Sequence, residues 1–162
     1  MSIHPIVRTL EKLISIHKEL CHVSKEKTEI LIEGSTEKLQ HLIAKERKYL
    51  QLLEQFEEKR QRDVEKWFEA HQFTTEEKTV TKMLELLNDE TEKQELEEVT
   101  IELTNMITTL KQQEQLNQEL LRQSLQLVQL TLDMIQPNIQ QINYGHKDTK
   151  ETDSRSVFDS QA

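Results

Sequence analysis

Apolar residues recur at intervals of three and four along the start of the chain, which is the spacing of one face of an amphipathic helix. They are Ile3, Ile6, Leu10, Leu13, Leu20 and Leu31, and His17 and Ser24 fill the remaining positions of the same face. Gly34 is the kind of residue that most often ends a helix, Ser35 can cap the next helix, and Glu37 is well placed in its first turn. The sequence therefore predicts a helix over about residues 3–33 and a tight reversal into a second, antiparallel helix.

A second apolar face predicts a helix over about residues 36–71. Its members are Leu39, Leu42, Tyr49, Leu53, Phe56, Val64 and Trp67, with Glu46 and Arg60 as polar interruptions. A new start signal follows, because Thr74 can accept a hydrogen bond from the backbone N–H of Glu77 while the Glu77 side chain reaches back. This capping pair predicts a short third helix within about residues 76–88, whose main part runs from Val80 to Asn88.

The last predicted helix covers about residues 90–142 and is the longest, because no Gly or Pro interrupts the sequence before Pro137. Its apolar face carries Val99, Leu103, Met106, Leu110, Leu120 and Leu127, with Asn117 and Ser124 at core-facing positions. Pro137 lacks a backbone donor and its ring clashes with the carbonyl of Asp133, so we expect the helix to kink or end there and to restart beyond it. Residues 145–162 are polar and aperiodic, which predicts a disordered tail.

From Leu120 onward the apolar residues of this helix occupy two stripes instead of one. The first stripe comprises Leu121, Leu125, Val128, Leu132, Ile135, Ile139 and Ile142. The second stripe comprises Leu116, Leu120, Leu127, Leu130 and Met134, and lies about a hundred degrees around the helix. Together they cover roughly half of the circumference, and a helix with such an arc needs two neighbours to bury it.

Two interpretations of the stripes follow from the sequence. The last helix can fold back and close an ordinary four-helix bundle that hides both stripes. No turn signal lies between Leu103 and Gln136, however, and an uninterrupted helix leaves several Leu and Ile side chains exposed. Burying each of these contributes roughly 1.5 to 3 kcal/mol, so the second interpretation is a binding surface for a partner protein.

Asn117 and Ser124 allow two interpretations as well, because a polar group at a core-facing position costs stability unless it is hydrogen-bonded. Either they fix the register of helix packing, as a single buried Asn does in a coiled coil, or they bond to a partner segment that docks beside them.

The composition supports an all-α fold, namely a helical hairpin, a short helix and a long C-terminal helix in a coiled-coil-like bundle over residues 1–144. Only 35% of the residues are hydrophobic and 31% are charged, and the chain holds two Gly and two Pro. Sheet folds need more turn residues than this. The net charge of -9, with Lys and Arg interleaved with Glu, argues against nucleic-acid binding.

The cysteine content and the N-terminal sequence indicate the cellular compartment of the protein. Cys21 is the single cysteine, and the N-terminus lacks the pattern of a signal peptide, so we expect a reducing cytoplasm. The most hydrophobic stretch, Leu120 to Ile142, is interrupted by Arg122 and Asp133, so we expect no membrane span.

Candidate chemistry is sparse. Gly occurs only at positions 34 and 145, which excludes phosphate-cradling loops and dinucleotide fingerprints. Glu19 and His22 make one Glu-x-x-His pair of the kind that di-metal helical bundles use, but a second pair is missing. His17 and Cys21 could supply two zinc ligands without a third. We therefore predict no catalytic residue, no metal site and no cofactor, and a metal-dependent bundle enzyme rests on Glu19 and His22 alone.

Two passages, Glu33–Leu39 at the hairpin turn and Leu116–Leu125 in the last helix, resemble the FlgN family of flagellar type III export chaperones. The order of helices and the polar tail that ends at Phe158–Ala162 agree with that family. The resemblance implies a cytoplasmic chaperone that binds the C-terminal segments of hook-associated proteins, which form the hook–filament junction, and delivers them to the type III export gate.

The cargo-binding residues that we predict on this basis are Asn117, Leu120, Leu121, Ser124, Leu125, Val128, Leu132, Ile135 and Ile139. The resemblance also implies that Tyr144 docks on the cytosolic domain of the export gate. The rival hypothesis is a coiled-coil scaffold or adaptor that self-associates through the same stripes. The sequence leaves the oligomeric state and the identity of the client open.

Overall fold

The computed structural model describes the backbone of residues 1–145 and the side chains of residues 1–136. This part of the chain forms four helices and no strand: α1 (His4–Glu33), α2 (Thr36–Ala70), α3 (Val80–Leu86) and α4 (Glu90–Gly145). The all-α prediction is confirmed. The described part of the chain divides into two units, and the division falls inside α4, between Leu120 and Leu121. That residues 1–144 form a single bundle stays a prediction.

The turn between α1 and α2 has the caps that the sequence predicts. Gly34 adopts the left-handed conformation with φ of 78°, and its N–H donates to the carbonyl of Ile30 at 2.9 Å. The Ser35 hydroxyl accepts from the N–H of Lys38 at 3.3 Å, and the Lys38 ammonium donates to the Glu33 carboxylate at 2.7 Å. Left-handed backbone is costly for residues with a Cβ, so glycine is the residue that permits this reversal.

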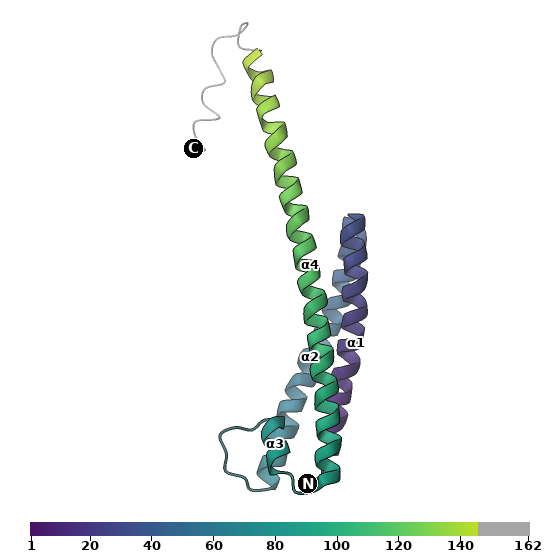
Figure 1. Ribbon diagram of the computed structural model, residues 1–162, viewed down its shortest axis with the longest axis vertical. Helices are drawn as coiled ribbons and strands as arrows, with labels where there is room; N and C mark the ends of the chain where they lie inside the picture. The colour runs from purple at the N-terminus through teal and green to yellow at the C-terminus, as the bar shows by residue number, and fades with distance from the viewer. Residues whose placement is uncertain (146–162) are drawn as a thin grey trace. The chain divides into compact units, whose positions relative to one another are not determined.

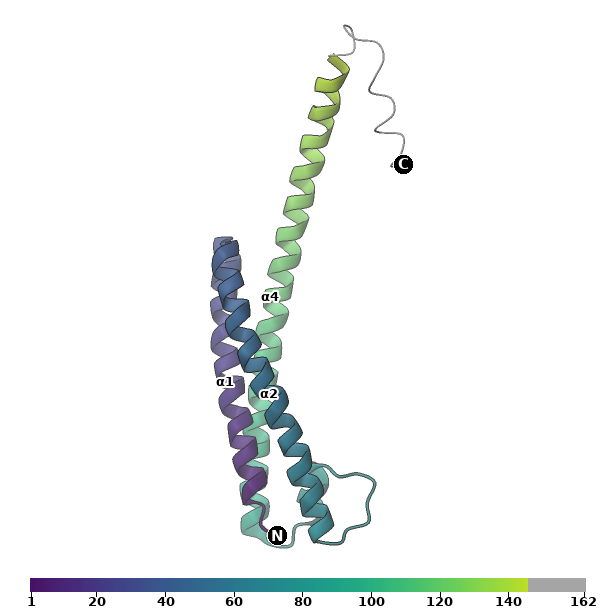
Figure 2. The same cartoon turned by 180° about the vertical axis from the view of Figure 1, so that it is seen from behind.

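Within residues 1–120, α1 and α4 run parallel and α2 runs antiparallel to both (Figures 1 and 2). The bonds between the helices show the directions. Lys18 and Lys27 of α1 pair with Glu102 and Glu114 of α4, so the residue numbers rise together. Lys27 also pairs with Glu46 of α2, whereas Thr9, near the start of α1, bonds to Asp63 near the end of α2.

The core of this unit lies where the start of α1, the end of α2, α3 and the start of α4 meet (Figure 1). Its buried members are Ile3, Ile6, Val7, Leu10, Leu13, Ile14, Val64, Trp67, Phe68, Val80, Met83, Leu96 and Leu103. Trp67 is its largest side chain and packs edge-on against Phe68 at 5.1 Å and nearly parallel to Phe73 at 5.7 Å between ring centroids. Burial of these aromatic groups is the main favourable contribution here, because large rings remove the most apolar area from water.

A polar group in the same region is buried with its partners. Asp63 is only 9% exposed, and its carboxylate accepts from the Thr9 hydroxyl at 3.0 Å and from the Lys59 ammonium at 2.6 Å. A buried carboxylate without such donors would destabilise the fold, so the three side chains form one structural contact between α1 and α2.

Helix α3 begins at Val80, as predicted for its main part, and not at the outer bound of residue 76. The hydroxyl that accepts from the N–H of Glu77 belongs to Thr75, at 3.2 Å, so the predicted capping pair of Thr74 and Glu77 is wrong. The helix starts at Val80, because Thr79 is extended and its hydroxyl accepts from the N–H of Lys82 at 3.1 Å. This start places Val80 and Met83 in the core, so burial selects between two locally plausible caps.

Helix α4 starts at an N-cap aspartate, since one Asp89 carboxylate oxygen accepts from the N–H groups of Thr91 at 2.8 Å and Glu92 at 3.2 Å. It then continues to Gly145, close to the predicted end at residue 142, so of the kink or end expected at Pro137 an end does not occur, and the helix does not reverse to close a four-helix bundle. Proline in a helix costs about 3 kcal/mol, which helix formation on both sides offsets. The predicted tail, apart from Gly145, lies outside the described residues.

Gly34 offers a direct test of the hairpin turn. Replacing it by Ala should lower the free energy of unfolding by roughly 1 kcal/mol, because the left-handed backbone conformation is strained for Ala and not for Gly. No atom lies within 4 Å of a Cβ built at this position, so the loss is conformational and not steric. Gly34→Asn should lose less, since Asn tolerates this region better. Urea denaturation measures all three proteins, and equal stability of Gly34→Ala would contradict the observed turn.

Candidate partner-binding surface on the last helix

A buried polar layer joins α1 and α4 in the second half of the unit formed by residues 1–120. Asn117 is 3% exposed, and its amide donates to the backbone carbonyl of Ser24 at 2.9 Å and to the Ser24 hydroxyl at 3.0 Å. Its amide oxygen accepts from the Thr28 hydroxyl at 2.5 Å, and Gln113 donates to that hydroxyl at 2.6 Å. The polar groups of Asn117 are therefore used within the chain, which supports its interpretation as a residue that fixes register.

Lys27 extends the polar layer to α2. Its ammonium lies 2.5 Å from a Glu46 carboxylate oxygen and 3.2 Å from a Glu114 oxygen, and the side chain is largely buried. Burial alone would lower the pKa of Lys27, but the hydrogen bonds and charges of Glu46 and Glu114 outweigh it and raise that pKa above its ordinary value. Lys27 thus stays charged at neutral pH and bridges three helices through two carboxylates.

The unit that begins at Leu121 has a different surface. Every side chain described in it, from Leu121 to Gln136, is exposed. The large apolar ones range from 46% exposed at Leu121 to 73% at Met134. We define the apolar surface as Leu121, Leu125, Leu127, Val128, Leu130, Leu132, Met134 and Ile135. Contiguous exposed apolar residues of this number are unusual on a monomer and mark interaction sites.

The other side of this helix segment is polar but poor in charge. It carries Arg122, Gln126, Gln129, Asp133 and Gln136, of which Arg122 and Asp133 are the charged residues of the segment 121–136. The Gln129 amide donates to the Asp133 carboxylate at 3.0 Å, one turn further along. An amphipathic helix with an apolar side this wide can bind a partner helix by burial of aliphatic side chains, with little contribution from ion pairs.

The predicted cargo-binding residues fall into three groups. Leu121, Ser124, Leu125, Val128, Leu132 and Ile135 are exposed, whereas Asn117 is buried and Leu120 is half-buried in the unit Met1–Leu120. Ile139 and Tyr144 belong to α4, but their side chains lie outside the described residues. Leu127, Leu130 and Met134 were not among the predicted site residues, although their membership of the second stripe was visible in the sequence.

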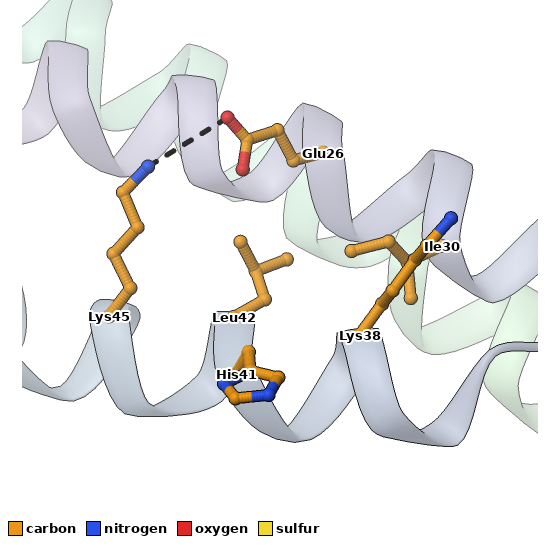
Figure 3. A pocket seen from close by; sticks show the side chains of 6 residues that line it. All are labelled: Glu26, Ile30, Lys38, His41, Leu42 and Lys45. Carbon is orange, nitrogen blue, oxygen red and sulfur yellow. Dashed lines mark ion pairs between the residues drawn. The ribbon is translucent and has the colours of Figure 1, made fainter.

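A hollow of about 320 Å³ opens between α1 and α2 near the hairpin turn (Figure 3). Ile30 and Leu42 supply its aliphatic lining, and Glu26, Lys38, His41 and Lys45 supply its polar lining. Lys45 pairs with Glu26 at 3.8 Å, and Lys38 pairs with Glu33 at 2.7 Å. Its ammonium groups therefore already have partners, and exposed ion pairs of this kind contribute little energy. We regard the apolar surface of residues 121–136 as the stronger candidate.

Metal ligation finds no support within the described part of the chain, where no three His, Cys, Asp or Glu side chains come together in a way that could hold an ion. Glu19, one of the candidate ligands, instead accepts a hydrogen bond from the Tyr49 hydroxyl at 3.4 Å. Burial raises the pKa of the Cys21 thiol, the other candidate ligand type, with Lys25 acting in the opposite direction.

None of the helices, as far as they are described, combines the length and hydrophobicity that a bilayer crossing requires.

Comparison with known proteins identifies a family and a relative. The model of the family described as FlgN protein matches residues 1–152. A protein of Bacillus subtilis (strain 168) described as "Uncharacterized protein YvyG" is 30% identical over 165 residues, an alignment that covers 100% of both chains. No solved structure matches the chain.

Substitution of Asn117 separates a structural from a binding role. Asn117→Ala should lower the free energy of unfolding by about 1 to 3 kcal/mol, because it removes the hydrogen bonds that this buried amide makes to Ser24 and Thr28. Gln118→Ala, at the neighbouring exposed position, should change it by less than about 0.5 kcal/mol. Thermal and urea unfolding provide the measurement. Unchanged stability of Asn117→Ala together with loss of client binding would assign this residue to the binding surface instead.

Proposed function

The chain belongs to the FlgN family of flagellar export chaperones, and on that premise we propose that it binds the C-terminal segments of hook-associated proteins through the apolar surface of residues 121–136. The observation that carries the proposal is the exposure of all eight large apolar side chains of that surface. A protein that has to hold a client before export needs apolar area that its own fold leaves uncovered. FlgN is a family of chaperones and not of enzymes.

The chemistry of the apolar surface indicates how a client would bind. An unfolded client segment that is amphipathic when helical can lay its apolar side against Leu125, Val128 and Leu132, which follow one another at intervals of three and four. Ordering that segment costs conformational entropy, which offsets part of the energy of burial. The resulting affinity is moderate, as a carrier that has to release its client requires.

We further propose that the chaperone acts in the cytoplasm and delivers the client to the cytosolic domain of the export gate, with Tyr144 as the docking residue. Tyr144 lies in the last turn of α4, past Pro137 and outside the apolar surface in sequence. A site beyond the client-binding residues would allow the gate and the client to be bound at the same time.

A self-associating scaffold is the second candidate function. The observation that favours it is the three-four spacing of the first stripe, which is the spacing of a coiled-coil seam. Sedimentation equilibrium of the protein without a client distinguishes the two functions, because a scaffold forms a stable oligomer that buries the apolar surface, whereas a chaperone keeps that surface free until a client binds.

Client binding is tested by Leu125→Asp plus Val128→Asp. Two carboxylates inside the interface should weaken binding of a hook-associated protein at least about tenfold, because each would be buried without a partner. Gln126→Asp plus Gln129→Asp adds the same charge with the same spacing on the polar side and serves as the matched control, which should bind within about twofold of wild type. Pull-down and isothermal titration provide the measurement. Equal recovery of the client by wild type and the first variant would reject the proposed surface.

Docking on the export gate is tested by Tyr144→Ala. The substitution should leave client binding unchanged, because position 144 is outside the apolar surface, and should weaken binding to the purified cytosolic domain of the export gate several-fold. Both affinities are measured on the same preparation. Undiminished binding of the gate domain would remove Tyr144 from the docking site without affecting the proposal for the client.

A further inference from the structure

Helix α1 shows what a helix of this chain looks like when it has two neighbours. It packs against both α2 and α4, as the bonds of Thr9 to Asp63 and of Ser24 to Glu114 and Asn117 show. Its buried residues are Ile6, Val7, Thr9, Leu10, Leu13, Ile14, Ile16, His17, Leu20, Cys21, Val23 and Ser24. At about 100° per residue these positions cover an arc of about 200°.

Helix α2 shows the contrasting case. Its buried residues are Leu42, Asp63, Val64, Trp67 and Phe68, which cover an arc of about 140° by the same count. The remaining circumference is largely polar and faces water, and the apolar residues Ile43 and Leu52 lie exposed just outside the arc. The buried arc of α2, whose contacts with α3 and α4 in the core lie near its C-terminal end, is therefore narrower than that of α1.

The apolar surface of residues 121–136 has the width of the two-sided case. Leu130 and Leu125 mark its edges, and the arc between them is about 220°. Ser124 and Thr131 lie between the two stripes, and Gln123 lies within the second stripe. The Thr131 hydroxyl donates to the carbonyl of Leu127 at 2.9 Å, within the helix. A single partner helix covers only about one stripe, because helices contact along a narrow seam.

We infer that one client chain places two helical segments on this helix, one on the first stripe and one on the second. This inference rests on the proposed chaperone function and adds the form in which the client is held. The segments are recognised by aliphatic side chains at three-four spacing and not by charge, since Arg122 and Asp133 are the charged residues between Leu121 and Gln136 and both lie on the polar side.

Other occupants fit the surface less well. The remaining sequence of this chain, residues 146–162, contains Val157 and Phe158 as its large apolar residues, too few to cover two stripes. A second copy of the chain in a two-fold dimer would supply one neighbouring helix, so one stripe would stay exposed. A client with two amphipathic segments covers both stripes with a single chain.

Two double variants test the inference. Leu125→Gln plus Val128→Gln removes the middle of the first stripe, and Leu127→Gln plus Leu130→Gln removes the middle of the second. Gln126→Ala plus Gln129→Ala on the polar side is the matched control. Gln is a good helix former and already predominates on the polar side, so circular dichroism should show unchanged helix content in all three. The probe is the C-terminal segment of the hook–filament junction protein from the same genome.

The expected result is that each stripe variant binds the client segment at least about tenfold more weakly, while the control binds within about twofold of wild type. Light scattering should give one client per chaperone. Loss of binding in the first-stripe variant alone, or two client chains per chaperone, would overturn the inference and leave the chaperone function standing. Unchanged binding in both stripe variants would reject the proposed surface itself. A dimer without client that either stripe variant dissociates would identify a second copy as the occupant and overturn the inference.

Discussion

Burial of α1 against two helices at once is the interaction on which the unit of residues 1–120 depends. Only about a third of this chain is hydrophobic, so a broad core like that of a typical globular domain cannot form. Concentrating the apolar residues on one helix solves this problem, because the same side chains of α1 contribute to its contacts with α2 and with α4. Helices α2 and α4 can then remain largely polar on their outer sides.

The low apolar content of the chain also explains the polar layer around Lys27. Toward the hairpin turn the apolar residues become fewer, and contacts between α1 and α4 pass from aliphatic packing to hydrogen bonds among Ser24, Thr28, Glu114 and Asn117. Such bonds contribute less net energy than apolar burial, but they have strict geometric requirements. They specify which turns of the two helices face each other.

Much of the fold could be predicted because its signals are local. Gly34 acts through its backbone conformation, and Ser35 acts through a hydrogen bond to a residue three positions away, so the hairpin turn can be predicted from the sequence. The capping residue of α3 could not be predicted in this way, because Thr74 and Thr79 can both cap a helix and the choice depends on the burial of Val80 and Met83. The bridge of Lys27 to Glu46 and Glu114 was missed as well, since a lysine among glutamates looks like any solvated position until three helices come together.

The candidate site, like the fold, could be predicted from the sequence only in part. The first stripe could be read from spacing alone, and its described members are exposed as a binding surface requires. Asn117 could not be assigned, because its partners Ser24 and Thr28 are far away in sequence and only the packed helices show that its amide is already bonded. Sequence periodicity identifies which side chains share a side of a helix, whereas the structure decides which of them are left for a partner.

Trp67 is the single tryptophan of the chain, and it is enclosed by Phe68, His71 and Phe73 in the core of residues 1–120. The apolar surface of residues 121–136 contains no aromatic residue at all. Tryptophan emission of this protein consequently reports whether the core of residues 1–120 is folded, and not whether a client occupies residues 121–136.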